Sequence, residues 1–133
     1  MIDKNIINIA SNNKNYGLKN DSTHKANCKN IQCGDKIKIE LIVEKKKIKM
    51  MRYETESCVY CEASASLLSS QITKFTIDEL KKDSNCFKNI IKKKEIIIPA
   101  RYKIFKNLIK IKNLNRINCI MLPFSALFKA LKI

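Results

Sequence analysis

The chain has 133 residues, six of them cysteines, and carries a formal net charge of +15. A domain of this length buries about two thirds of its unfolded surface and needs no disulfide bonds to fold, so we expect one domain spanning residues 1–133. Lysine supplies 24 of the 27 basic residues and, with 22 isoleucines and 14 asparagines, fills nearly half of the chain. AT-rich codons encode all three residue types, so the base composition of the gene is enough to explain the positive charge. A nucleic-acid partner is therefore not the first expectation, but a basic nucleic-acid-binding module is kept as an alternative function.

The amino-terminal segment, residues 1–10, carries Asp3 and Asn5 among its isoleucines. It holds no uninterrupted apolar run long enough for a signal-peptide core or a membrane span. We therefore expect a cytoplasmic protein without membrane contact. In a reducing compartment, six cysteines are more typical of metal ligands or reactive thiols than of three disulfides.

Alternating polar and apolar residues predict a small antiparallel sheet. Residues 36–43 alternate in this way, and residues 48–53 continue the pattern after the charged turn at 44–47, which indicates a β-hairpin. Two strands alone are seldom stable in water. We therefore expect a third strand over Thr23–Asn27.

About five helices are expected to pack on this sheet, which makes the fold class α+β. The first two helices are expected at residues 2–9 and about 60–72, and a third, short helix begins at the capping box of residues 76–79. A fourth helix has an apolar face with Tyr102, Phe105, Leu108 and Ile109, and the last helix spans about 120–131. The fourth helix is expected to lie on the sheet. Pro123 would be tolerated in the first turn of the last helix, and Lys92–Lys94 would form a solvated linker.

Three cysteines and one aspartate are the candidate site. Gly34 lets the backbone turn after Cys33, and Asp35 points its carboxylate to the same side as that thiol. Cys58 and Cys119 stand at predicted helix starts, where the pKa of a thiol is lowered. Three thiolates and a carboxylate suit a four-coordinate Zn(II) or an iron-sulfur cluster, and the carboxylate is the ligand that would leave first.

Other interpretations of the cysteines remain open. Cys28 and Cys86 are read as small buried hydrophobic residues and left out of the site. Cys58-x-x-Cys61 could be a redox pair, although no βαβ pattern supports a thioredoxin-like fold. It could also be half of a zinc ribbon with Cys28-x4-Cys33 as the other half, although the spacing of that second pair is wide for a zinc ribbon. The single histidine, His24, lies in a polar stretch and is expected at the surface.

At these residues the chain resembles the NifU/IscU/SufU family of iron-sulfur cluster assembly proteins over nearly its whole length. The resemblance is carried by Cys33-Gly34-Asp35, Ser57-Cys58, the Ala-Ser-Ala-Ser stretch at 63–66, the Cys-x-x-Leu-Pro-Phe-x-Ala-Leu segment at 119–127 and, weakly, Asn-Tyr-Gly at 15–17. It implies a SufE/NifU-like fold, with a three-stranded sheet and one metal or cluster at the end of that sheet.

The same resemblance implies roles for individual residues. Cys33, Asp35, Cys58 and Cys119 would hold the [2Fe-2S] cluster or Zn(II). Cys33 would accept persulfide sulfur from a SufS-like cysteine desulfurase. The product would pass to a downstream cluster carrier or to apo-proteins.

Within the family the chain leans toward the SufU type. IscU-type members have a histidine directly before the last cysteine, where this chain has Asn118. SufU-type members have a longer interval between the second and third cysteines and an arginine at the position of Arg116. SufU-like proteins bind zinc and transfer persulfide, whereas IscU-like proteins assemble a cluster. Whether the chain is a zinc-dependent sulfurtransferase or a scaffold therefore stays open.

The sequence departs from the family at two positions beside the second cysteine. Ser57 stands where a glycine is common, and Cys61 is an extra thiol one helical turn after Cys58. Cys61 could replace a ligand or resolve a persulfide.

Overall fold

The sheet is antiparallel and has the order β1-β2-β3 in a computed structural model that describes residues 4–93, 97–110 and 115–133. Its strands are β1 (His24–Lys29), β2 (Lys36–Glu44) and β3 (Lys47–Glu56). The expected third strand is confirmed and runs two residues further than predicted. The hairpin is also confirmed, with Ile39 opposite Tyr53 and Leu41 opposite Met51.

Only two residues, Lys45 and Lys46, connect β2 to β3. Their φ angles are 50° and 63°, both in the left-handed region. This turn geometry matches the right-handed twist of the flanking strands and allows the tightest hairpin connection. Lys-Lys is not a typical sequence for such a turn, which is usually built from Asn and Gly.

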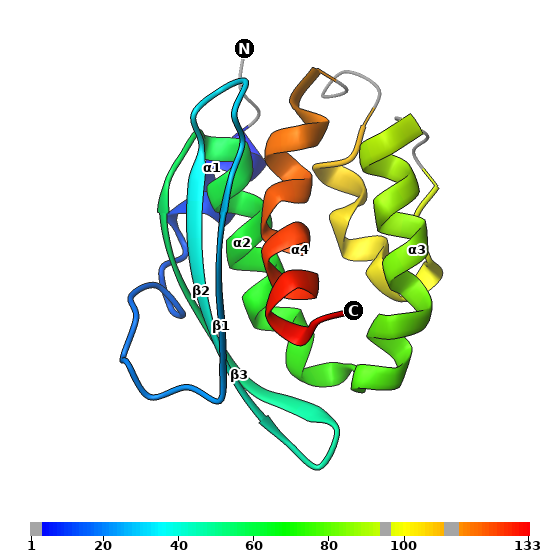
Figure 1. Cartoon of the computed structure of the whole chain (residues 1–133). Coiled ribbons are helices and arrows are strands. Elements are labelled where there is room, and N and C mark those ends of the chain that lie inside the picture. Colours follow the sequence, from blue (N-terminus) through cyan, green and yellow to red (C-terminus); the bar gives the residue numbers. More distant parts are fainter. Residues whose placement is uncertain (1–3, 94–96, 111–114) are drawn as a thin grey trace.

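The helices lie on one side of the sheet (Figure 1). They are α1 (Lys4–Ser11), α2 (Val59–Gln71), the 3₁₀ helix η1 (Ile72–Lys74), α3 (Ile77–Lys93), the 3₁₀ helix η2 (Ala100–Asn107) and α4 (Ile117–Leu131). Helices α2 and α4 contact the sheet directly, and α3 packs on α4 from outside. The α+β class with a three-stranded sheet and a helical layer is therefore confirmed.

The core lies between the sheet and the layer of α2 and α4. Alternate residues of β2, namely Ile37, Ile39 and Leu41, turn one face of the strand inward and are almost completely buried. Leu68 of α2 and Leu127 of α4 are fully buried in the same cluster. Burying one such side chain contributes about 1.5–3 kcal/mol, so this interface fixes how the two helices sit on the sheet.

The prediction that residues 102–109 pack on the sheet was wrong. Tyr102 and Phe105 are buried, but their rings contact aromatic residues of α3 and α4. The ring centroids of Tyr102 and Phe87 are 4.7 Å apart, and those of Phe105 and Phe124 are 5.1 Å apart. Because α2 and α4 already cover the inner face of the sheet, this apolar segment packs on the helices instead.

The capping box at the start of α3 is confirmed. The Glu79 amide donates to Thr76 Oγ1 at 3.1 Å, and the Thr76 amide donates to Glu79 Oε1 at 2.9 Å. The helix is longer than expected and continues to Lys93, so Lys92 and Lys93 are helical and not a linker. Lys94 lies outside the described residues.

Helix α4 begins at Ile117, three residues before the predicted start. Pro123 therefore lies in the second turn and not in the first. Because proline lacks an N–H group, the Cys119 carbonyl does not receive its usual helical hydrogen bond from Pro123. In the described residues no helix is long and apolar enough to cross a membrane.

Candidate metal centre

Three separate parts of the fold bring the predicted site residues to one end of the sheet. Cys33 and Asp35 lie in the connection between β1 and β2, Cys58 is the N-cap residue of α2, and Cys119 is in the first turn of α4. Gly34 has a φ of 78°, a left-handed conformation that favours glycine. This turn places Cys33 and Asp35 beside the two helix starts.

Two of the thiols lie against each other. Cys33 Sγ is 3.7 Å from Cys119 Sγ. The possible ligand atoms of Cys33, Asp35 and Cys119 all lie within 4.8 Å of one another. Cys33 is exposed, whereas Asp35 and Cys119 are only 6% and 5% exposed. The group is therefore buried on one side and open to a reactant at Cys33.

Asp35 contacts Cys58 through both carboxylate oxygens. The Cys58 amide donates to Oδ1 at 3.2 Å, and the Cys58 thiol donates to Oδ2 at 3.4 Å. The amide belongs to the free N–H groups that begin an α-helix, and a carboxylate is a favourable acceptor at that position. Asp35 thus fixes the start of α2 and holds Cys58 next to the other two residues.

These separations suit a tetrahedral metal ion. Two sulfurs bound at about 2.3 Å in tetrahedral geometry lie about 3.7 Å apart, and a sulfur and an oxygen lie about 3.6 Å apart. The structure has 3.7 Å between Cys33 and Cys119 and 3.4 Å between Cys58 and Asp35. Cys58 is not among the three residues whose ligand atoms all converge, and it joins them through its bonds to Asp35. Thiols and a carboxylate are donor groups that both Zn(II) and an iron-sulfur cluster accept.

Without a metal ion, the Cys119 thiol strongly retains its proton. Burial is the main reason that its pKa is raised, and the adjacent Asp35, Cys58 and Cys33 raise it further. A bound cation reverses this effect, because a metal ion removes the proton of a coordinating thiol. A group of acidic side chains this close together is therefore best suited to hold a cation.

Cys61 is separate from this group. Its side chain is completely buried in the first turn of α2. Like Cys58, it lies outside the three residues whose ligand atoms all converge, but the hydrogen bonds to Asp35 in the described residues come from Cys58 and not from Cys61. Burial is the main cause that raises the pKa of its thiol to about 12. This environment is typical of a structural cysteine and gives no support to Cys61 as a ligand or a reactive thiol.

Arg116 lies at the start of α4 and is exposed. Its guanidinium carbon is 5.8 Å from the centre of the Tyr60 ring in α2, a cation–π distance. It therefore connects the starts of the two helices that carry Cys58 and Cys119. Cys28 and Cys86, which the sequence interpretation left out of the site, are half-buried and lie outside the converging group.

One site-supporting residue was missed by the sequence interpretation. Ser64, in the buried small-residue stretch of α2, donates from Oγ to the Ile120 carbonyl of α4 at 2.6 Å. This bond joins the helices that present Cys58 and Cys119. The run of small residues indicated close approach of a neighbouring helix, but not which helix or which carbonyl.

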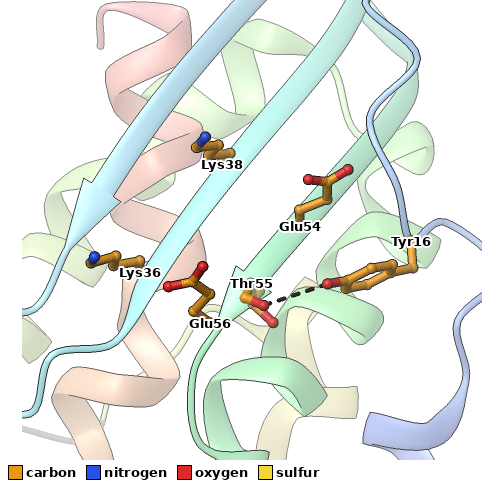
Figure 2. A pocket seen from close by; sticks show the side chains of 6 residues that line it. All are labelled: Tyr16, Lys36, Lys38, Glu54, Thr55 and Glu56. Atoms are coloured by element: carbon orange, nitrogen blue, oxygen red, sulfur yellow. Dashed lines mark hydrogen bonds between the residues drawn. The ribbon is translucent and has the colours of Figure 1, made fainter.

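Beyond the site, the outer face of the sheet has a hollow of about 290 Å³ (Figure 2). Lys36 and Lys38 of β2 lie opposite Glu56 and Glu54 of β3, and the Tyr16 hydroxyl donates to the Thr55 carbonyl at 3.4 Å. The hollow begins one residue from Asp35 but contains none of the cysteines.

Comparison with known proteins gives the family. The sequence of residues 1–132 matches the NifU-like N terminal domain. The chain is 36% identical over 75 residues to a protein of Thermotoga maritima named iron-sulfur cluster assembly scaffold protein IscU. That alignment covers 56% of this chain and 53% of the relative, so the chain spans about half the length of the curated relative that it matches.

Solved structures have the same fold. A NifU-like protein (N-terminal) from Brucella abortus superposes with a TM-score of 0.83 at 19% identity, over 98% of this chain and 91% of that one. A putative iron-sulfur cluster assembly scaffold protein for the SUF system from Fervidobacterium islandicum gives 0.80 at 24% identity, over 98% and 96%.

The fold thus places the chain in a class of small α+β proteins, with cysteines and an aspartate gathered at one end of the sheet. This chain belongs to the NifU-like N terminal domain family. The resemblance found in the sequence is confirmed.

Proposed function

We propose that this chain is an iron-sulfur cluster assembly protein of the SufU type, which receives sulfur from a SufS-like cysteine desulfurase. Membership in the NifU-like family supports the proposal, as do the printed names of the Thermotoga and Fervidobacterium proteins. The observation that carries it is the exposed Cys33 thiol, 3.7 Å from the buried Cys119 thiol and beside the Asp35 carboxylate.

Cys33, Asp35, Cys58 and Cys119 would hold the metal. When bound there, Zn(II) or iron keeps the thiols deprotonated at neutral pH. Cys58 and Cys119 lie at buried or half-buried helix starts and would remain in place. Cys33 lies in a loop at the surface and is the thiol that an incoming protein reaches first.

The transfer at Cys33 balances without an external oxidant. The Cys33 thiolate attacks the terminal sulfur of a cysteine persulfide on the desulfurase. A new S–S bond forms on Cys33, the old S–S bond breaks, and its electron pair leaves on the desulfurase thiolate. The sulfane sulfur then leaves Cys33 by the same exchange with an acceptor thiol.

Two features favour the SufU type over a scaffold of the IscU type. Asn118 offers no imidazole beside Cys119, and residues 59–118 form the long interval between the second and third site cysteines. We also propose that the protein lies in the cytoplasm, because a reducing compartment keeps cysteines available as ligands and reactive thiols.

Metal content after anaerobic purification from cells given iron and zinc tests the proposal. About one zinc per chain and no visible colour is the result expected of a four-ligand SufU-type site. Iron with acid-labile sulfide and a brown chromophore would instead make the chain a cluster scaffold.

Serine variants make the test specific to these residues. Cys33→Ser, Cys58→Ser and Cys119→Ser are each expected to lower the metal content, whereas Cys86→Ser on α3 is the matched control that retains it. A chain that holds no metal and binds random duplex DNA with steep salt dependence would support the nucleic-acid alternative.

A further inference from the structure

Strand β1 leaves one edge of the sheet unpaired. In the described residues β1 pairs with β2 alone. The Asn30 amide donates to the Asp35 carbonyl at 2.8 Å, which continues the β1–β2 register as a hydrogen-bonded pair. Because such pairs alternate along an antiparallel ladder, Lys25, Asn27 and Lys29 direct their backbone N–H and C=O groups away from β2.

A second contact supports this assignment. Lys129 of α4 donates from Nζ to the Asn27 carbonyl at 2.9 Å, as expected of a carbonyl that β2 does not use. The Lys129 side chain therefore covers one backbone group of the edge. In the part of the chain that the structure describes, the outward backbone groups of Lys25 and Lys29 have no protein partner.

The surface beside this edge is strongly basic. A hollow of about 490 Å³ lies along β1 and is lined by four lysines and no carboxylate. Its lining residues are Asn27, Cys28, Lys29, Lys36, Ile37, Lys38 and Lys129.

The charge differs on the other side of β2. There the same Lys36 and Lys38 face Glu56 and Glu54 across the sheet (Figure 2). The Glu54 and Glu56 carboxylates thus lie toward β3. Glu40 lies opposite Lys25, but it is only 3% exposed and accepts the amides of Lys19 and Asn20. The exposed charges at the edge of β1 are therefore those of lysines.

We propose that an extended acidic peptide segment of a partner protein binds along β1 as a fourth strand. The backbone of such a segment would satisfy the outward N–H and C=O groups, as in other cases of strand addition. Its alternate carboxylates would lie beside Lys25 and Lys29. Its remaining side chains would cover Ala26 and Cys28, which are only half-buried at this edge.

Lys129 would exchange one acceptor for another during this binding. The Asn27 carbonyl would take a peptide N–H, and the released ammonium would pair with a carboxylate of the peptide. The exchange leaves no buried polar group unpaired, which is the condition for strand addition at a covered edge.

A second copy of this chain fits the edge poorly. Pairing β1 with itself would place lysines opposite or diagonal to lysines, and like charges across a strand pair are destabilising. Edge lysines commonly prevent sheet-to-sheet association in this way. The same lysines attract a strand of opposite charge.

The test uses a fluorescent peptide of about seven residues with alternating Glu and Val, and measures anisotropy at low salt. Saturable binding by the full chain is expected. Two variants with equal charge changes locate it: Lys25→Glu with Lys29→Glu on β1, and Lys81→Glu with Lys82→Glu on the exposed side of α3. The first is expected to weaken binding at least about tenfold and the second to change it little.

A peptide with N-methyl groups on alternate amides separates strand addition from general charge attraction. It keeps every carboxylate but cannot donate to the edge, so it is expected not to bind. Amide exchange at Lys25, Asn27 and Lys29 is expected to slow only with the unmodified peptide.

Equal binding of the two peptides, or equal loss in the two double variants, would overturn the proposal in favour of unspecific charge attraction. Tighter binding of single-stranded DNA, or concentration-dependent dimers without peptide, would overturn it in favour of a nucleic acid or a second copy. Metal content does not enter this test, so it stands apart from the proposed function.

Discussion

The carboxylate of Asp35 binds Cys58 twice, through its amide at 3.2 Å and its thiol at 3.4 Å. One side chain therefore serves both the fold and the candidate metal centre. It satisfies an N–H group at the start of α2 and places an oxygen where a fourth ligand is needed. Two different substitutions of Asp35 distinguish its role in the fold from its role as a ligand.

Asp35→Asn keeps an acceptor for the Cys58 amide but removes the anionic ligand. We expect the stability of the metal-free protein to change little and its zinc affinity to fall at least about tenfold, measured by competition with a chromophoric chelator. Asp35→Ala loses the hydrogen bond as well, and is expected to lower the free energy of unfolding by about 1 kcal/mol more than Asp35→Asn. Unchanged zinc affinity in both variants would remove Asp35 from the ligand set.

Substitution of Cys61 tests whether this extra thiol takes part in metal binding or sulfur transfer. Since it is completely buried and apart from the converging ligand atoms, Cys61→Ser is expected to keep the metal content and sulfur transfer of the unmodified protein. Its free energy of unfolding should fall by about 1–3 kcal/mol, because a hydroxyl replaces a thiol in the core. Loss of metal without loss of stability would show that Cys61 is a ligand.

The raised pKa of Cys61 gives a pH dependence with a definite sign. The unfolded thiol titrates near 9.0 and the folded one near 12, so its contribution to stability is complete below pH 9 and is lost as the pH rises toward 12. As the pH of the metal-free protein rises from 9 toward 12, the free energy of unfolding of Cys61→Ala should therefore fall less than that of the unmodified chain. Denaturant unfolding at several pH values measures the difference, and parallel curves would contradict it.

The sheet and the start of α3 were predictable from local patterns. Alternation in the first part of β2 predicts which face is buried, and Ile37, Ile39 and Leu41 are buried as expected. The capping box from Thr76 to Glu79 contains both of its partners within four residues, so its hydrogen bonds follow from sequence alone.

The features that were missed depend on contacts between distant segments. Tyr102 and Phe105 have an apolar spacing that predicts burial, but not whether the sheet or the helices cover them. Pro123 fits a first turn by its usual preference. Tertiary packing nevertheless starts α4 three residues earlier, at Ile117.

The capping box itself can be tested by substitution. Thr76→Ala removes the acceptor for the Glu79 amide and is expected to cost about 1 kcal/mol of unfolding free energy. Ser70→Ala, on the exposed side of α2, is a control in which a side-chain hydroxyl outside any cap is lost. Similar losses in the two variants would contradict a special role of the cap.

Glu79 also has a pH dependence. Its hydrogen bond from the Thr76 amide, more than the charge of Arg101, lowers its pKa below the usual 4.5. The charged form therefore adds stability above that pH, which is lost as the pH falls through the folded pKa. The stability difference between the unmodified chain and Glu79→Gln should accordingly shrink in acid, measured by thermal unfolding between neutral pH and pH about 3.

Glu40 has a structural role that the polar–apolar alternation of β2 does not predict. It lies on the outer face of β2, where alternation predicts exposure, yet it is only 3% exposed. Its Oε1 accepts the amides of Lys19 at 2.8 Å and Asn20 at 3.2 Å. Arg52 of β3 donates to the Gly17 carbonyl at 2.9 Å, so two charged side chains hold the segment before β1 on the sheet.

Glu40→Ala would leave both amides without their acceptor and is expected to release this segment. Trypsin should then cleave after Lys19 faster than in the unmodified chain, and amide exchange at Lys19 and Asn20 should accelerate. Glu44→Ala, at the exposed end of the same strand, changes the charge equally and should leave both rates unchanged. Because an unsatisfied buried polar group costs about 1–3 kcal/mol, the release should increase the local exchange rate by about tenfold or more. Equal cleavage of the two variants would mean that Arg52 alone holds the segment.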